Sequence, residues 1–140
     1  MHPVPRILHA GDGALVAEYG DAIDARLNAR VRQLQRALEA VRPSGVTELV
    51  PTYRSLLVHY DPMVVRHESA AALVLDAAGQ LSDDPGGPTS VVTIPVTYGG
   101  AEGPDLADVA AHAGLGEAEV VDLHAAGDYL VFMIGFMPGF

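Results

Sequence analysis

The stretch GALVAEYGDAIDARLNARVRQLQRALEAV, residues 13–41, decides the fold because it places a short strand directly before a long amphipathic helix. Residues 13–19 are β-leaning, and Gly20-Asp21 breaks the strand. We expect Asp21 to cap the helix by accepting the amide of Asp24. Apolar residues then recur every three or four positions, a spacing typical of a helix over 23–41. They are Ile23, Leu27, Val31, Leu34, Leu38 and Val41.

Outward from this helix, the alternation of elements predicts an α+β domain. VTELV (46–50) and SLLVHY (55–60) favour two adjacent antiparallel strands. Asp61-Pro62 begins a second helical stretch, which runs to about Gln80. With VVTIPVTYG (91–99) as a final strand, the order matches a ferredoxin-like split β-α-β arrangement, with both helices on one face of the sheet.

SDDPGGPTS, residues 82–90, is the clearest linker, so we expect domains at 1–85 and 86–140. Beyond it, short helices are predicted from Asp105 to about Ala113 and from about Glu117 to Ala125. DYLVFMIGF (128–136) is apolar on both faces and is predicted to be a strand buried on both sides. Residues 91–140 therefore resemble the opening part of a larger β-domain whose other strands are not in this chain, and we expect the chain to self-associate.

Composition excludes several classes of function. The formal charge of −10 opposes nucleic acids and anionic lipid surfaces, and five of the eight arginines are spread around the predicted helix instead of forming a stripe. The absence of cysteine excludes disulfides and thiolate chemistry, and the absence of lysine excludes a P-loop or a Schiff base. No apolar run is long enough to span a membrane, so we expect a cytoplasmic protein.

Two glycine-rich elements are the candidate binding site for a substrate or partner. In both, glycines let the backbone approach a ligand, and the second brackets a Pro-Gly turn with two aromatic rings. The first element contributes Tyr98, Gly99, Gly100 and Asp105, and the second contributes Gly135, Phe136, Pro138, Gly139 and Phe140. Capping of the next helix is the simpler role for Asp105, as core packing is for the aromatic turn.

The remaining polar residues suggest no metal centre. His112 and His124 are twelve residues apart on different predicted helices, whereas helical metal ligands are usually three or four apart. We expect both histidines to be structural or surface residues. The sequence identifies no catalytic residue, and it contains no Gly-x-Ser-x-Gly motif.

IPVTYGGAEGPDLADVAAHAGLGEAEVVDLHAAGDYLVFMIGFMPGF, residues 94–140, closely resembles the family of the 5-oxoprolinase B subunit, also described as allophanate hydrolase subunit 1 or the KipI type. Residues 11–34 and 50–62 are similar to the same family. The resemblance implies an N-terminal α+β domain followed by a cyclophilin-like β-barrel. Family members continue past the Gly-Phe-x-Pro-Gly-Phe element, and we expect the barrel to be incomplete here.

The resemblance implies one subunit of an ATP-dependent enzyme that opens 5-oxoproline to glutamate. It implies ATP and Mg²⁺ in the complex, a homologous C-type partner with a cyclophilin-like fold, and a third, A-type partner. The KipI branch implies instead an inhibitor of sensor histidine kinase autophosphorylation, and the older name implies allophanate hydrolysis, which we rank last. Without lysine, phosphate and Mg²⁺ would have to be bound by arginines, backbone amides and carboxylates, and the sequence shows no cluster of them. We therefore expect much of the catalytic apparatus to lie on partner subunits or in the rest of the barrel.

Overall fold

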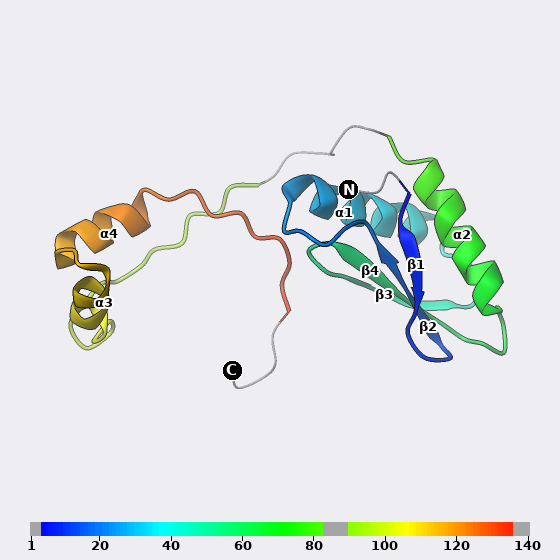
Figure 1. Ribbon diagram of the computed structural model, residues 1–140, viewed down its shortest axis with the longest axis horizontal. Coiled ribbons are helices and arrows are strands. Elements are labelled where there is room, and N and C mark those ends of the chain that lie inside the picture. Colours follow the sequence, from blue (N-terminus) through cyan, green and yellow to red (C-terminus); the bar gives the residue numbers. More distant parts are fainter. Residues whose placement is uncertain (1–3, 83–89, 136–140) are drawn as a thin grey trace. The chain divides into compact units, whose positions relative to one another are not determined.

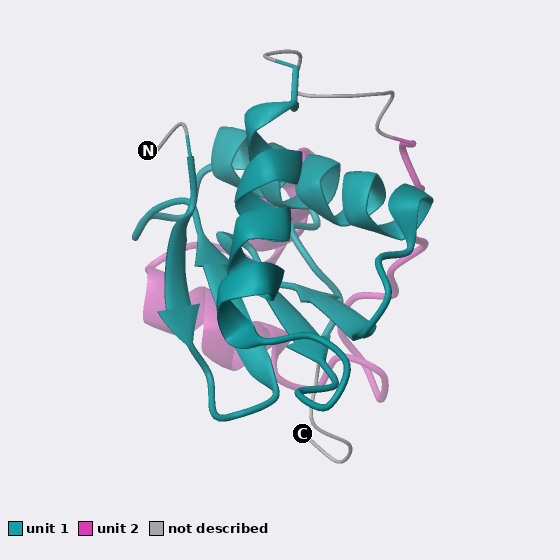
Figure 2. Cartoon of the chain, turned by 90° about the vertical axis from the view of Figure 1, so that its right-hand side faces the viewer, with its two compact units in different colours: residues 1–87, 131–140 teal, residues 88–130 magenta. Residues whose placement is uncertain are grey.

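The computed structural model describes residues 4–82 and 90–135, which form two compact units. Unit 1 comprises Met1–Gly87 with Val131–Phe140, and unit 2 comprises Pro88–Leu130 (Figure 2). Each unit is treated by itself below. The domain boundary expected at residues 85/86 remains a prediction.

Unit 1 contains a four-stranded sheet, drawn from blue to green in Figure 1. Its strands are β1 (Arg6–His9), β2 (Ala14–Glu18), β3 (Val46–Pro51) and β4 (Ser55–Tyr60), in the order β1-β2-β4-β3. All three neighbouring pairs are antiparallel. The α+β class and the pairing of β3 with β4 are confirmed.

Two helices cover one face of this sheet. Helix α1 (Ala25–Val41) connects β2 to β3, and α2 (His67–Gly79) follows β4. The buried cluster takes alternate residues from the two central strands and one stripe from each helix, so the helices share a face. It consists of Leu15, Ala17, Tyr19, Leu27, Val31, Leu34, Leu38, Leu56, Val58, Tyr60, Ala70, Val74 and Ala78.

The edge of the sheet differs from the predicted arrangement. The prediction gave 91–99 as the final strand of this arrangement, or else as the start of a new domain. The sheet instead gains β1, which was not predicted and which pairs with β2 from Arg6↔Glu18 to His9↔Leu15. Residues 91–98 form no strand. A hairpin partner four residues away closes the sheet edge with little loop entropy, whereas 91–99 would have to return across a long connection.

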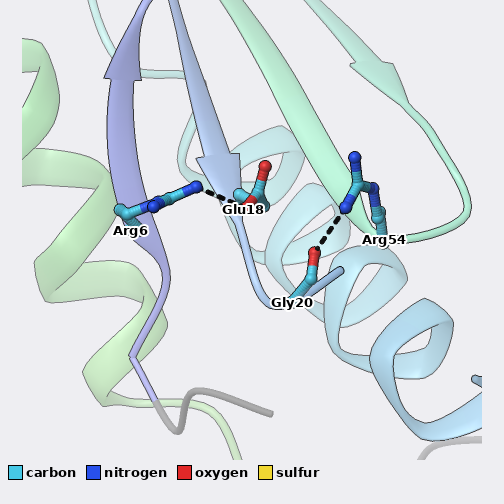
Figure 3. Close-up of polar contacts among 4 residues, drawn as sticks. All are labelled: Arg6, Glu18, Gly20 and Arg54. Carbon is cyan, nitrogen blue, oxygen red and sulfur yellow. Dashed lines mark hydrogen bonds and ion pairs between the residues drawn. The ribbon is translucent and has the colours of Figure 1, made fainter. Parts of the chain in front are cut away.

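Figure 3 shows two polar contacts at one end of this sheet. The guanidinium of Arg6 pairs with the carboxylate of Glu18 at 2.9 Å and joins β1 to β2. Arg54, just before β4, donates to the carbonyl oxygen of Gly20 at 3.2 Å. The second contact ties the β2–α1 connection to the β3–β4 hairpin.

Both helices of unit 1 begin later than predicted. Asp24, not Asp21, caps α1, because its extended backbone lets the carboxylate accept the amides of Arg26 and Leu27. Ile23 therefore precedes the helix and is 73% exposed instead of packing in the core. Helix α2 begins at His67 because Asp61 closes a separate turn, accepting the amide of Met63 on its side chain.

Unit 2 contains two short helices, α3 (Leu106–Ala113) and α4 (Glu117–Ala125), which confirm the prediction. Gly114, at φ +68°, ends α3 in the left-handed conformation that glycine tolerates best. The described part of this unit contains no strand, and Ala110 is its buried apolar residue. Nowhere in residues 4–82 and 90–135 is a helix long and apolar enough to cross a bilayer.

The predicted strand at 128–136 is not formed over the described residues 128–135. The segment has no backbone partner that would complete a ladder, so its β propensity is not expressed. Within unit 1, the buried side-chain amide of Asn28 on α1 donates to the carbonyl oxygen of Phe132 at 2.9 Å. Most of the segment's apolar side chains are exposed.

Candidate functional site

The shortest side-chain contact between distant residues of unit 2 joins Tyr98 and His124. The Tyr98 hydroxyl lies 2.6 Å from Nδ1 of His124, although 26 residues separate them in the chain. The two rings meet edge to face, with centroids 5.6 Å apart and planes at 81°. Tyr98 begins the glycine-rich loop and His124 lies in the last turn of α4, so the contact connects the two ends of the unit.

Tyr129 is a second tyrosine in contact with His124. Its hydroxyl donates to the carbonyl oxygen of His124 at 3.0 Å, and its ring centroid lies 5.4 Å from that of the imidazole. Gly127 makes this approach possible, since a Cβ atom there would lie 2.9 Å from the Tyr129 ring. We call Tyr98, His124 and Tyr129 the aromatic cluster.

The loop after Tyr98 is folded back on itself by its glycines. Gly99 and Gly100 have φ of +71° and +61°, and the amide of Gly103 donates to the carbonyl oxygen of Gly99 at 3.1 Å. A Cβ atom on Gly103 would lie 2.7 Å from the nitrogen of Gly99. The loop therefore requires glycine at these positions, and it places Tyr98 at a fixed distance from α3.

Asp105 does not act as the predicted side-chain cap. It occupies the N-cap position of α3, but its carboxylate makes no capping hydrogen bond. Its backbone is already helical, at φ −88° and ψ −2°, whereas a capping side chain normally requires extended geometry.

The second predicted element is described only at Gly135, which is exposed and belongs to unit 1. Phe136, Pro138, Gly139 and Phe140 lie outside the described residues. Of the predicted site residues, Tyr98, Gly99, Gly100 and Asp105 share one loop of unit 2.

The sequence did not identify two members of the aromatic cluster. His124 was expected to be structural or a surface residue, and Tyr129 was assigned to a buried strand, but it is 69% exposed. The residues next to His124 in the sequence do not indicate the cluster, because its partner Tyr98 lies 26 positions earlier in the chain, before α3.

A second histidine contact lies in unit 1. His9 and His67 stack with ring centroids 3.6 Å apart, and the Tyr60 hydroxyl is 3.1 Å from Nδ1 of His67. Over the described ranges, the structure brings no three histidine, aspartate or glutamate side chains together in a way that could hold a metal ion.

The described structure thus defines a small α+β protein in which a tyrosine at the start of a glycine-rich loop contacts an exposed histidine of α4. Comparison with known proteins identifies its family. The chain belongs to the family of the carboxyltransferase domain, subdomain C and D, which matches residues 5–140.

Curated relatives from several bacteria carry the same name. The chain is 34% identical to the B subunit of 5-oxoprolinase from Bacillus subtilis (strain 168), over 96% of this chain and 60% of the relative. It is 36% identical to the protein of that name from Escherichia coli O157:H7, over 93% of this chain and 58% of the relative. The chain thus spans about three fifths of the length of these relatives.

A solved structure supports the same relationship. The crystal structure of TTHA0988 is 31% identical to the chain, with a TM-score of 0.73, and the match covers 90% of this chain and 24% of that one. The likeness therefore extends over both units of the chain.

Proposed function

We propose that this chain is part of one subunit of an ATP-dependent enzyme that opens the 5-oxoproline ring to glutamate. The observation that carries the proposal is the 34% identity to a 5-oxoprolinase B subunit over 96% of the chain. A chance match would not extend through the linker and both glycine-rich elements.

The finer parts of the proposal concern the rest of the enzyme. We propose that residues from about 91 onward belong to a cyclophilin-like barrel, which agrees with the exposed and unpaired apolar segments at 91–96 and 129–134. The partners are a homologous C-type subunit and a third, A-type subunit. The protein acts in the cytoplasm, where ATP is available.

The described residues do not fit a nucleotide site. The chain has no lysine, and residues 4–82 and 90–135 bring no three carboxylate or imidazole groups together for Mg²⁺. We therefore assign ATP and Mg²⁺ to the complex outside the described residues, either to the partner subunits or to the rest of the barrel. The described residues are assigned to binding the lactam or the partner subunits.

Reconstitution tests the proposal directly. The native protein is mixed with the A-type and C-type subunits from the same organism, and glutamate and ADP are measured after addition of 5-oxoproline and ATP. We expect both products only when all three subunits are present. Glutamate formation without this protein would contradict the proposal, as would a complex that captures only a histidine kinase or that consumes allophanate instead.

A further inference from the structure

We propose that His124 is the proton donor to the lactam nitrogen as the ring opens, and that Tyr98 orients it; this inference rests on the proposed function. The two nitrogens of the imidazole differ in their surroundings. Nδ1 is held by the Tyr98 hydroxyl at 2.6 Å, and the described residues offer Nε2 no hydrogen-bond partner. The side chain therefore has one fixed nitrogen and one nitrogen open to a ligand.

The surroundings of His124 differ from those of a core histidine. A structural imidazole is normally buried with both nitrogens bonded, but His124 is exposed. Its ring nevertheless contacts two aromatic rings, those of Tyr98 and Tyr129. Because these contacts already orient the imidazole, it can present Nε2 to a substrate with little further loss of side-chain conformational entropy.

Two glycines are needed to build this arrangement. Gly127 leaves space for the Tyr129 ring, and Gly103 allows the loop that carries Tyr98 to close. Besides the tyrosines of the aromatic cluster, no titratable side chain makes a hydrogen bond or ring contact with the His124 imidazole in the described part of the chain. His112 on α3 has no such contacts and provides a matched control.

Ring opening requires a proton donor at one atom. When a nucleoside triphosphate has phosphorylated the lactam oxygen and water has added to the carbonyl carbon, that carbon carries a hydroxyl, a phosphate and the ring nitrogen. If the C–N bond breaks, its electron pair goes to nitrogen, which must take a proton because an amide anion is too basic to leave. The hydroxyl on that carbon gives its proton to water and becomes the carbonyl of an acyl phosphate, which a second water hydrolyses to the carboxylate of glutamate and free phosphate. Histidine is the side chain best suited to protonate the nitrogen near neutral pH.

The competing reaction makes this role measurable. If the same adduct breaks its C–O bond to phosphate instead, phosphate leaves, the lactam is restored and the triphosphate has been consumed without opening the ring. Phosphate needs no proton to leave. Loss of the proton donor should therefore raise the ratio of ADP to glutamate, whereas a purely structural defect lowers both products together.

The experiment measures ADP and glutamate in the reconstituted complex with His124→Gln, Tyr98→Phe and His112→Gln. We expect His124→Gln to raise the ADP-to-glutamate ratio about tenfold or more and to slow glutamate formation about 100-fold. Tyr98→Phe should raise the ratio by a smaller factor, and His112→Gln should leave it unchanged. An unchanged ratio in His124→Gln, whatever its rate, overturns the inference.

Two outcomes distinguish a failure of the proposed function from a failure of the role given to His124. A wild-type complex that makes no glutamate overturns the proposed function, and this inference falls with it. If His124→Gln fails to assemble with the other subunits, Tyr98→Phe decides, since it removes only the hydroxyl that holds Nδ1. A ratio in Tyr98→Phe equal to that of wild type then overturns the inference while the proposed function stands.

Discussion

Tyr19 is the residue of unit 1 whose chemistry most opposes its surroundings. Its side chain is fully buried beneath α1, and its hydroxyl has no hydrogen-bond partner in the structure. Desolvation raises the pKa of this phenol to about 12, although the nearby charge of Arg30 lowers it. The hydroxyl is therefore neutral at physiological pH and costs stability because its bonds to water are not replaced.

Replacing Tyr19 with Phe should therefore stabilise unit 1 at pH 7, by about 1 kcal/mol. At high pH the wild type should also lose stability, because Tyr19 ionises more easily in the unfolded chain than in the folded one. The free energy of unfolding of the wild type is unaffected by this ionisation below pH 10 and falls by on the order of 2 kcal/mol as the pH rises toward 12. Urea denaturation at pH 7, 10 and 11.5 measures both effects, and an alkaline loss as large in Tyr19→Phe as in wild type would contradict them.

Gly45 allows a different residue-scale prediction. It has φ +86°, and a Cβ atom there would lie 2.8 Å from Val65. Gly45→Ala should destabilise unit 1 by about 2 kcal/mol, combining left-handed strain with a clash. Gly79 has open space at the end of α2, so Gly79→Ala should instead stabilise by about 0.5 kcal/mol. Thermal unfolding of both variants checks the difference in sign.

At the scale of elements, a hydrogen bond holds the segment at residues 131–135 in unit 1. Asn28→Ala should release it, because the Phe132 carbonyl oxygen loses its donor while the core beneath α1 stays packed. Limited chymotrypsin digestion should then cut at Phe132 several-fold faster, with an unchanged melting temperature to within a few degrees. A control, Gln35→Ala, removes an exposed bond within α1 and should not change the cutting rate. Equal cutting in wild type and Asn28→Ala would show that the segment is not held there.

Elements were predictable from the sequence where local chemistry decided them. The spacing of Leu27, Val31, Leu34 and Leu38 predicted the buried face of α1, and glycines and Pro104 marked the limits of α3 and α4. The strand β1 was missed because four residues, RILH, carry almost no periodicity. Residues 91–99 were assigned to a strand from their β-branched side chains, but a strand also needs a partner, which no local pattern records.

The candidate site shows the same limit. Tyr98 and its glycines were identified, because a glycine-rich turn is visible in a few adjacent residues. His124 and Tyr129 were not, because their relation to Tyr98 depends on how α3 and α4 fold back. A contact between residues 26 positions apart cannot be predicted from the residues next to either partner.

At the scale of the whole molecule, the chain exposes more apolar surface than a stable monomer usually does. Val91 is 93% exposed, Ile94 74% and Ile134 95%. We expect the 140-residue chain to bind a hydrophobic dye and to sediment as a dimer or larger species at micromolar concentration. The double substitution Val91→Asp with Ile94→Asp should reduce both signals. Met63→Asp, at an exposed residue of unit 1, is the control, and a dye-free monomeric wild type would contradict the expectation.

The placement of β1 at the edge of the sheet has a consequence for biosynthesis. Every strand pair of unit 1 joins segments within residues 6–60, and the last member of its buried cluster is Ala78. A nascent chain folds from its N-terminus as it leaves the ribosome. The first sheet and its helices are therefore complete in sequence before the ribosome has translated Val91. If 91–99 had been the partner of β2 instead of β1, β2 would have lacked that partner until residues 91–99 were synthesised. With β1 in that place, the later apolar segments emerge when every strand of the described sheet is already available, and Phe132 can add its contact with Asn28 to a core that is complete in sequence.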